Sequence, residues 1–307
     1  MLLLLLLIIT ISIIFLFWAA IRNNNYWKKK GIPGPKPLPL KGNIDQIFGK
    51  NIAAIQKQKW SKEFGSVYGI KNGWFNELVI SDPVMVKQVF VDKFEKFHGR
   101  AFERHTILEE IVLNCVLFLL AGFDTTSNNL SLMAHYLVMY PEVQKRLFEE
   151  IEEVCGDRDE MPSYEELAKL KYADAVFRET QRLCPIASGV TRICEETTTL
   201  GGIIVEKGTN ISIDLLTLHR DAKLWGEDAE EFKPERWLNG EELTFYYPFG
   251  GGPRICIGLR FAIMETKMIL VRLLKTFELK RCLETEAELK FSGQIVLNPG
   301  KGRAQYA

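Results

Sequence analysis

The chain begins with a run of apolar side chains that is long enough to cross a membrane as one helix. Residues 1–21 have the sequence MLLLLLLIITISIIFLFWAAI, which contains no charged side chain. At 1.5 Å per residue such a helix spans about 31 Å, close to the hydrocarbon thickness of a bilayer. A cleaved signal peptide is the alternative, and the small pair Ala19 and Ala20 favours it. Signal peptides, however, have a shorter apolar core of about 7–15 residues behind a positive segment. We therefore expect an uncleaved transmembrane anchor.

A basic and proline-rich segment, residues 22–40, follows the predicted anchor. Its positive charges, Arg22 and the three lysines 28–30, predict that the rest of the chain faces the cytoplasm, with Tyr26 and Trp27 at the membrane interface. Four prolines between positions 33 and 39 oppose helix and favour extended backbone. The segment is therefore predicted to be a stiff hinge between the membrane and one domain over residues 41–307.

Beyond the hinge, hydrophobic periodicity predicts a mainly α-helical domain with small β-sheets. Predicted helices cover residues 52–64, 84–90, 108–140, 141–154, 172–183 and 259–274. Predicted strands cover 66–70 and 77–80, joined by an Asn-Gly turn at 72–73, and then 188–194 and 202–215. The helix over 108–140 is apolar all round, but polar residues at 124–129 favour the protein interior over a second membrane span.

Composition excludes several classes of function. Lys and Arg number 39 and balance 39 Asp and Glu, without a long basic run, so nucleic acid is not an expected partner. Hydrophobic residues make up 47% of the chain, which is enough apolar surface to exclude a disordered protein. The six cysteines form no C-x-x-C pair, and the four histidines lack zinc-ligand spacing. A phosphate-binding loop at Gly250–Gly252 is a weak alternative, because the strand-loop-helix context with G-K-[ST] is missing.

The segment with the clearest chemistry is a glycine-rich loop, FGGGPRICIG at 249–258, which presents Cys256 just before a predicted helix. A helix N-terminus favours a thiolate and offers it backbone N–H groups, as a metal ligand requires. An isolated cysteine in a turn is more commonly a small buried side chain. The residues around Cys256 decide between these two interpretations.

The loop fits F-x-x-G-x-R-x-C-x-G at every fixed position. With this string the chain resembles the cytochrome P450 family of haem-thiolate monooxygenases. The resemblance implies that Cys256 is the axial ligand to the iron of haem b, that Arg254 pairs with a haem propionate, and that Phe249 packs beside the sulfur. Gly258 completes the cofactor-binding segment. Electron donation by a thiolate ligand favours O–O cleavage.

Two further segments strengthen the resemblance by pairing with each other. Glu179 and Arg182, in ETQR, share a helix face at spacing i, i+3, which alone is typical of a solvent-exposed ion pair. Downstream, PERW at 234–237 resembles the family's P-E-R-F segment, with Trp in the last place. The resemblance implies that Glu179, Arg182 and Arg236 form a buried network that supports the haem-binding loop, since an unpaired member would leave a buried charge.

The long predicted helix contains AGFDTT at 121–126, which resembles the family's A-G-x-[DE]-T-T. Alone it is equally a polar break in a core helix. By resemblance, Asp124 and Thr125 are catalytic and relay protons to the oxygen chemistry at the haem. Arg192 would meet a second propionate, and His219 would be structural. Residues 116–121, 186–190 and 292–293 would line the substrate pocket.

The resemblance is interrupted between about residues 101 and 108. Family members carry there a W-x-x-x-R helix that contacts the haem, together with lid helices over the substrate, whereas this chain runs almost directly into its long helix. Without them the haem pocket would be open to water, and apolar surface of the long helix would be exposed. The expected fold is therefore a cytochrome P450 fold that is truncated internally.

Two functional hypotheses follow. The first is a monooxygenase of the endoplasmic reticulum membrane that inserts one oxygen atom of O2 into an apolar small molecule, with electrons from NADPH through a flavoprotein reductase. The reductase would dock near Arg260 and Lys267. The second is a non-catalytic, membrane-anchored remnant or shortened isoform with impaired haem binding. The missing segment is the feature that separates the two hypotheses.

Overall fold

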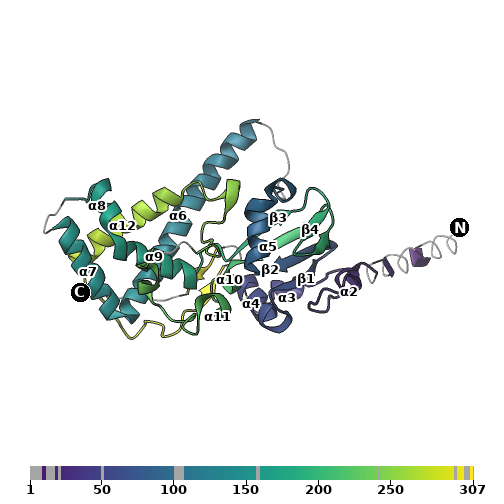
Figure 1. Ribbon diagram of the computed structural model, residues 1–307, viewed down its shortest axis with the longest axis horizontal. Coiled ribbons are helices and arrows are strands. Elements are labelled where there is room, and N and C mark those ends of the chain that lie inside the picture. The colour runs from purple at the N-terminus through teal and green to yellow at the C-terminus, as the bar shows by residue number, and fades with distance from the viewer. Residues whose placement is uncertain are drawn as a thin grey trace. The chain divides into compact units, whose positions relative to one another are not determined.

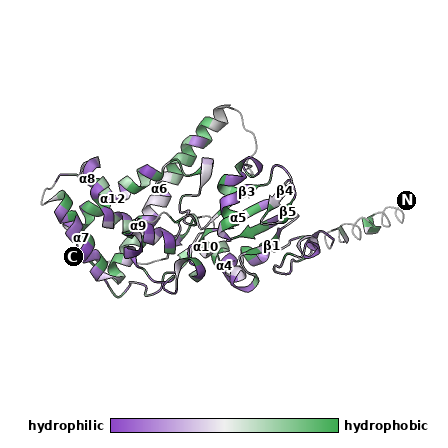
Figure 2. Cartoon of the chain, viewed as in Figure 1, coloured by the Kyte–Doolittle hydropathy of each residue, from purple (hydrophilic) through white to green (hydrophobic). Residues whose placement is uncertain are grey.

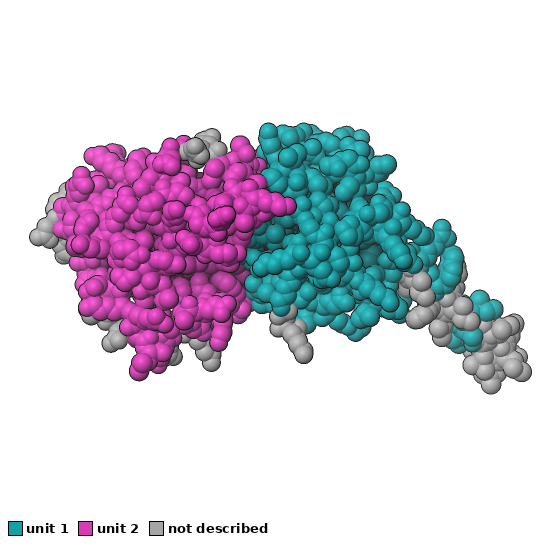
Figure 3. Space-filling view, turned by 60° about the horizontal axis from the view of Figure 1, so that its bottom comes forward, with its two compact units in different colours: residues 1–101, 189–218 teal, residues 102–188, 219–307 magenta. Residues whose placement is uncertain are grey.

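The computed structural model describes residues 9–11, 18–19, 22–49, 52–99, 107–156, 160–240, 243–293, 296–300 and 305–306. Within them the chain is mainly helical with small sheets, as the sequence predicts (Figure 1). Two compact units are formed, and each is built from two separate stretches of sequence (Figure 3). Unit 1 comprises residues 1–101 and 189–218, and unit 2 comprises residues 102–188 and 219–307.

Unit 1 is organised by a four-stranded sheet with the strand order β1-β2-β6-β3. β1 (Val67–Asn72) and β2 (Phe75–Ile80) form the antiparallel hairpin that the Asn-Gly turn predicts. β6 (Asn210–Asp214) runs parallel to β2, and β3 (Gly189–Ile193) pairs antiparallel with β6. The apolar run that ends β2 is fully buried, which places the core of unit 1 against this strand.

Helices and smaller elements complete unit 1. The predicted helix over 52–64 is α4 (Ala53–Phe64), whose Trp60 packs with Tyr68 and Val79 in the core. α5 (Pro83–Lys87) starts at a proline behind the Asp82 cap and continues into a π-helical turn. The remaining elements are short and are α2 (Tyr26–Lys29), α3 (Ile44–Ile47), a π-helix (Gln88–Asp92), a 3-10 turn (Phe94–Lys96), β4 (Thr198–Leu200), β5 (Ile203–Val205) and α10 (Leu215–Leu218).

The predicted hinge is part of unit 1 and is not a free spacer. Trp27, expected at the membrane interface, is buried, and its indole N–H donates to the carbonyl of Ile70 at 2.9 Å. The Gly69 amide donates to the carbonyl of Pro33 at 2.8 Å, so the proline-rich stretch lies along β1. Trp27 therefore serves the core, because β1 offers it an apolar surface and an acceptor. Most of the predicted anchor, residues 1–21, lies outside the described residues.

Unit 2 is a helical assembly around α6 (Ile107–Met139), α7 (Pro141–Cys155), α9 (Lys171–Leu183) and α12 (Leu259–Thr276), all near their predicted bounds. In α7, Val143, Leu147 and Ile151 repeat every fourth residue, and this spacing places them on one buried face. Leu132 and Leu137 of α6 join the same core. The remaining elements are α8 (Tyr164–Lys169), α11 (Ala222–Trp225), 3-10 turns at Pro234–Trp237 and Gly252–Arg254, β7 (Leu279–Lys280), β8 (Phe291–Ser292), β9 (Asn298–Pro299) and β10 (Gln305–Tyr306).

The long helix α6 differs along its length from the buried helix that the sequence predicts. Its C-terminal half packs into unit 2. The half before the polar run is strongly hydrophobic (Figure 2), and its side chains are exposed to solvent. The exposed apolar face consists of Ile111, Val112, Leu113, Val116, Leu117, Phe118, Leu119, Leu120 and Phe123. Within the described residues, 111–139 is also the single stretch long and apolar enough to cross a membrane, a test that core helices of soluble proteins pass as well.

We predict that Trp27→Ala destabilises the protein by about 3–5 kcal/mol, because it removes a buried indole and leaves a cavity beside β1. The measurement is the free energy of unfolding from denaturant titration of the detergent-solubilised full chain. Trp74→Ala is the matched control, since Trp74 is 48% exposed and its loss should change stability by about 0.5 kcal/mol or less. Equal effects of the two substitutions would contradict the packing role of Trp27.

Candidate functional site

The cysteine loop of unit 2 is closed by its own backbone. The Cys256 amide donates to the carbonyl of Phe249 at 3.0 Å, and a 3-10 turn at Gly252–Arg254 lies inside the closed segment. Gly250 and Gly252 have φ of 73° and 66°, a left-handed conformation that side chains with a Cβ rarely adopt. These two glycines therefore let the chain turn tightly before α12 begins.

The loop presents its cysteine outward. The Cys256 thiol is free and exposed, and Ile257 beside it is 85% exposed. Gly258 caps α12, and a Cβ added there would be in ordinary van der Waals contact with the Cys256 sulfur, at 3.9 Å. Arg254 is exposed on the same loop. The thiol is thus placed to bind a group that arrives from outside the loop.

Phe249 anchors the start of the loop to the helix behind it. Its ring stacks on Phe177 of α9 with centroids 6.1 Å apart and an interplanar angle of 6°. The sequence predicts a packing role for Phe249 beside the sulfur, and the structure adds the partner ring. Phe177 was missed because its only sequence signal is an aromatic side chain on the buried face of α9.

These residues fit a haem with a single protein ligand. Among the described residues no group of three or more His, Cys, Asp or Glu is placed to hold a metal ion. A soft thiolate suits the iron of a haem. The same unit also offers the exposed apolar face of α6 and exposed Ile255 and Ile257, which a flat apolar macrocycle could cover.

A buried ion pair in α9 is bound by many hydrogen bonds. Arg182 donates twice to the Glu179 carboxylate, at 2.9 Å from both Nε and Nη2, and both side chains are fully buried. Arg236 Nε donates to the same carboxylate at 2.9 Å. The structure therefore brings together the three residues that the sequence assigned to one network.

Further donors and acceptors satisfy the charges of this network. The Trp237 indole N–H and the Lys233 amide also donate to Glu179, at 2.9 and 3.0 Å. The remaining Arg182 hydrogens are accepted by three backbone carbonyls, those of His219, Ala229 and Glu231. Sequence reasoning missed these partners, because backbone groups carry no side-chain signal and Trp237 was noted only as a departure from the motif.

His219 links the network to the chain that enters the cysteine loop. Its Nε2 accepts a hydrogen bond from the Tyr247 amide at 3.0 Å, two residues before Phe249. Full burial, reinforced by the positive charge of Arg182, lowers the pKa of His219 to about 3. The ring is therefore neutral at physiological pH, as an acceptor at Nε2 requires, and its role is structural.

Asp124 and Thr125 lie on α6 where its exposed half meets its buried half. Thr125 Oγ1 donates to the carbonyl of Ala121 at 2.6 Å, four residues back, a pattern that bends helices and weakens their hydrogen-bond ladder. Asp124 is half-buried and Thr126 is buried. The polar run thus lies within a continuous α-helix, and its catalytic role remains a prediction.

Two basic residues lie in other settings than the sequence suggested. Arg192 is buried in β3 of unit 1, where it donates to the Thr191 carbonyl at 3.1 Å and lies 5.5 Å from the centre of the Phe90 ring. Its predicted contact with a propionate stays a prediction. Lys267, expected to meet a reductase, is buried beside Asp174 at 3.4 Å and donates to a backbone carbonyl. Arg260 is exposed as that role requires.

A mainly helical fold with one exposed cysteine on a glycine-rich loop before a helix, supported by a buried Glu-Arg network, is typical of haem-thiolate proteins. The family model described as Cytochrome P450 matches this chain over residues 32–109 and 103–306. The chain therefore belongs to the cytochrome P450 family, whose members hold haem iron through a cysteine thiolate and act as monooxygenases.

Curated relatives agree with this assignment. "Putative cytochrome P450 CYP13A7" of Caenorhabditis elegans is 44% identical over 211 residues, which cover 67% of this chain and 40% of the relative. "Putative cytochrome P450 CYP13A3" of the same organism is 46% identical over 202 residues, covering 64% and 38%. "Cytochrome P450 3A12" of Canis lupus familiaris is 41% identical over 210 residues, covering 66% and 41%. The chain thus spans about two fifths of the length of the curated relatives it matches.

We predict that Arg182→Ala destabilises the protein by about 3–5 kcal/mol, because it leaves the buried Glu179 carboxylate without its main partner. Lys145→Ala is the matched control, since it breaks an exposed i, i+4 pair with Glu149 and should cost at most about 0.5 kcal/mol. Denaturant titrations of both variants give the free energies of unfolding. A loss below about 1 kcal/mol for Arg182→Ala would show that the network does not support unit 2.

We predict that His219 makes the protein acid-sensitive. The unfolded chain protonates this ring near pH 6.5, whereas the folded protein resists protonation until about pH 3. Stability conferred by the neutral ring is therefore complete above about pH 6.5 and is lost as the pH falls toward 3, at up to about 1.4 kcal/mol per pH unit. Free energies of unfolding measured across this window should fall less steeply in His219→Gln than in the unmutated chain, while His98→Gln, the control, should follow the unmutated slope.

Proposed function

We propose that this chain carries the haem-binding part of a membrane-bound cytochrome P450 monooxygenase. The reaction is insertion of one oxygen atom of O2 into an apolar small molecule, with electrons supplied by NADPH through a flavoprotein reductase. The observation that carries the proposal is the free, exposed Cys256 thiol on a loop closed by its own backbone hydrogen bond. Membership of the family supports the general chemistry.

Each residue of the loop has a defined task in this proposal. Cys256 holds the haem iron as a thiolate, and Arg254, exposed beside it, pairs with a propionate. Phe249, stacked on Phe177, holds the loop against α9. When bound, a haem with a thiolate ligand supplies the activation of O2. Gly258 starts α12 directly behind the cysteine, and Arg192 is proposed as a second propionate partner.

The buried network fixes the position of the loop rather than taking part in the chemistry. Glu179, Arg182 and Arg236 are held by directional hydrogen bonds of 2.9 Å, so the backbone they bind cannot shift without exposing a charge. His219 extends this support to Tyr247, just before the loop. The loop is thereby preorganised, which the ligand geometry of a haem requires.

Asp124 and Thr125 are proposed to handle protons. Thr125 Oγ1 donates to a backbone carbonyl in the described arrangement and can rotate to donate elsewhere, while the Asp124 side chain is half-buried. A hydroxyl and a carboxyl on one helix turn are groups that can pass protons toward a bound haem. Their place in the polar run of α6 supports this assignment.

The proposed setting is the endoplasmic reticulum membrane, with residues 1–21 as the anchor and both units on the cytoplasmic side. The uncharged run at the N-terminus and the basic residues behind it support this topology. The substrate would reach the protein from the lipid phase, as suits an apolar small molecule. The flavoprotein reductase would share the same membrane and dock near exposed Arg260.

A second candidate is a non-catalytic remnant or shortened isoform that binds haem poorly. It is favoured by the exposed apolar face of α6, which is the surface the missing lid helices would be expected to cover. The two matches to the family model overlap at residues 103–109. The sequence analysis places the missing segment at nearly the same position, between about residues 101 and 108. Water would enter a haem site left open there, and catalysis in such a site would be impaired.

The decisive measurement is haem content together with the absorption spectrum of the reduced, carbon-monoxide-bound full chain. The unmutated chain should take up haem and show a thiolate-type Soret band. Cys256→Ala should lose that band, with a fall in haem affinity beyond the about 10–100-fold that outer-shell substitutions cost a metal site. Cys282→Ala is the matched control and should be unchanged.

Each other outcome has a definite meaning. A thiolate-type band that survives in Cys256→Ala would exclude Cys256 as the ligand. Failure of the folded, unmutated chain to take up haem would establish the remnant hypothesis instead. Haem uptake without oxygen insertion in the presence of NADPH and reductase would leave haem binding standing and exclude the monooxygenase activity of this chain.

A further inference from the structure

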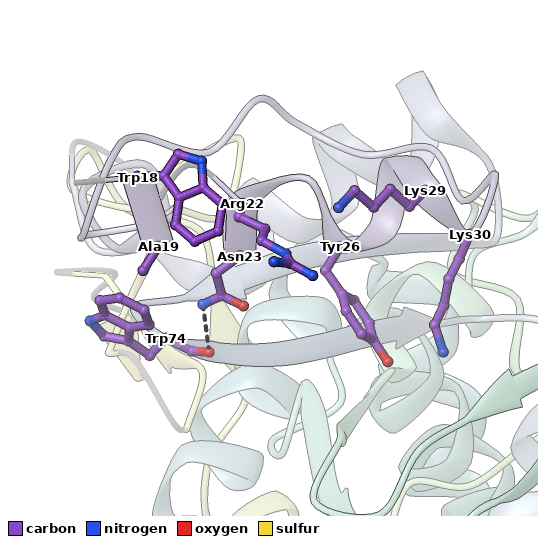
Figure 4. A pocket seen from close by; sticks show the side chains of 8 residues that line it. All are labelled: Trp18, Ala19, Arg22, Asn23, Tyr26, Lys29, Lys30 and Trp74. Atoms are coloured by element: carbon purple, nitrogen blue, oxygen red, sulfur yellow. Dashed lines mark hydrogen bonds between the residues drawn. The ribbon is translucent and has the colours of Figure 1, made fainter. Parts of the chain in front are cut away.

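Unit 1 contains a pocket of about 600 Å³ at the end of the chain that follows the predicted anchor. Its lining combines aromatic and basic side chains and consists of Trp18, Ala19, Arg22, Asn23, Tyr26, Lys29, Lys30 and Trp74 (Figure 4). Seven of these residues come from the segment 18–30, and Trp74 comes from the turn between β1 and β2. The pocket is thus lined by the end of the predicted anchor, by the start of the basic segment and by the β1–β2 turn.

The positive charges of this pocket are only partly compensated. Lys30 pairs with Glu206 at 2.8 Å and lies over the Tyr26 ring. Arg22 and Lys29 have no carboxylate within ion-pair distance in the described part of the chain, and Arg22 lies 5.4 Å from the centre of the Trp18 ring, where a cation-π contact can hold it. Two cations therefore face the pocket without an acidic partner.

A third cation lies beneath the pocket floor. Lys71 is buried, and its ammonium donates to three neutral oxygens: the side chains of Asn23 and Asn76 and the backbone carbonyl of Trp74, at 2.7–3.0 Å. Asn23 also donates to the Trp74 carbonyl, which ties the pocket lining to this ammonium (Figure 4). Burial lowers the pKa of Lys71 to about 8, so the group is mostly charged at neutral pH. The positive charge of Lys71 therefore also favours an anion in the pocket.

We propose that this pocket binds the phosphate of a phospholipid with net negative charge, from the membrane leaflet that faces the two units. Arg22 and Lys29 would contact the phosphate, and the exposed indoles of Trp18 and Trp74, 53% and 48% exposed, would lie among the headgroups. A lipid is favoured over a free phosphate because the pocket adjoins the predicted anchor and has aromatic walls. The proposal rests on the proposed anchor, but not on haem binding.

The lining also offers a sharp control. Lys28 carries the same charge as Lys29 and directly precedes it in sequence. Both lysines are exposed, but Lys28 does not line the pocket. Diffuse attraction to an anionic surface would weaken equally when either lysine is lost. A built site would lose affinity with Lys29 and not with Lys28.

The test uses the full chain reconstituted into phosphatidylcholine bilayers with a minor fraction of phosphatidylserine. Electron paramagnetic resonance of spin-labelled phosphatidylserine and phosphatidylcholine gives the relative affinity of the protein for each lipid. The unmutated chain should prefer phosphatidylserine. Arg22→Gln and Lys29→Gln should each lower this preference by about fivefold, as expected for one cation at an anionic surface. Lys28→Gln should leave it unchanged.

Three results would overturn the proposal. Equal losses in Lys28→Gln and Lys29→Gln would mean diffuse attraction, and equal immobilisation of both lipids by the unmutated chain would mean no headgroup site. Displacement of labelled phosphatidylserine by soluble glycerophosphate would assign the pocket to a free phosphate instead. Absence of immobilised lipid of either kind would show that the anchor itself fails, and haem content measured on the same samples keeps the monooxygenase proposal separate.

Discussion

The bidentate pair between Glu179 and Arg182 is the interaction on which unit 2 depends. Its carboxylate accepts five hydrogen bonds, from Arg182 twice, Arg236, Trp237 and the Lys233 amide. Two buried charges are expensive to desolvate, and they become acceptable only when every hydrogen-bonding position is filled with good geometry. This constraint ties α9 to the PERW turn and to three carbonyls of the chain between α10 and the cysteine loop. Hydrogen bonds to these buried charges therefore support the loop as much as apolar packing does.

The apolar face of α6 is a second feature of unit 2, and the cysteine loop does not cover it. A contiguous run of exposed Leu, Ile, Val and Phe side chains is unusual in a protein that functions without a partner. A haem and the helices that the sequence analysis expects to be missing would cover such a surface. The same unit thus combines a well-supported ligand loop with an uncovered apolar surface. The loop favours the monooxygenase hypothesis, and the uncovered surface favours the remnant hypothesis.

Unit 1 carries a different constraint, set by the chain behind the predicted anchor. Trp27 is drawn into the core by β1, so the basic segment is fixed on the sheet and its remaining cations surround a pocket. A flexible hinge would leave Arg22 and Lys29 as independent surface charges. Docking converts them into neighbours above the buried ammonium of Lys71. One buried indole in this way links the segment behind the predicted anchor to the fold of unit 1.

Sequence alone determined the local elements and the chemistry of the motifs. Apolar spacing gave the helices α4, α6, α7, α9 and α12 within a few residues, because periodicity records which face of an element avoids water. Glycine positions and Cys256 marked the loop. Tertiary structure alone decided the burial of Trp27 and Lys267, the exposure of half of α6, and the partners of Glu179 other than Arg182 and Arg236. These outcomes depend on what covers an apolar face or meets a charge, and such long-range contacts leave no trace in local spacing.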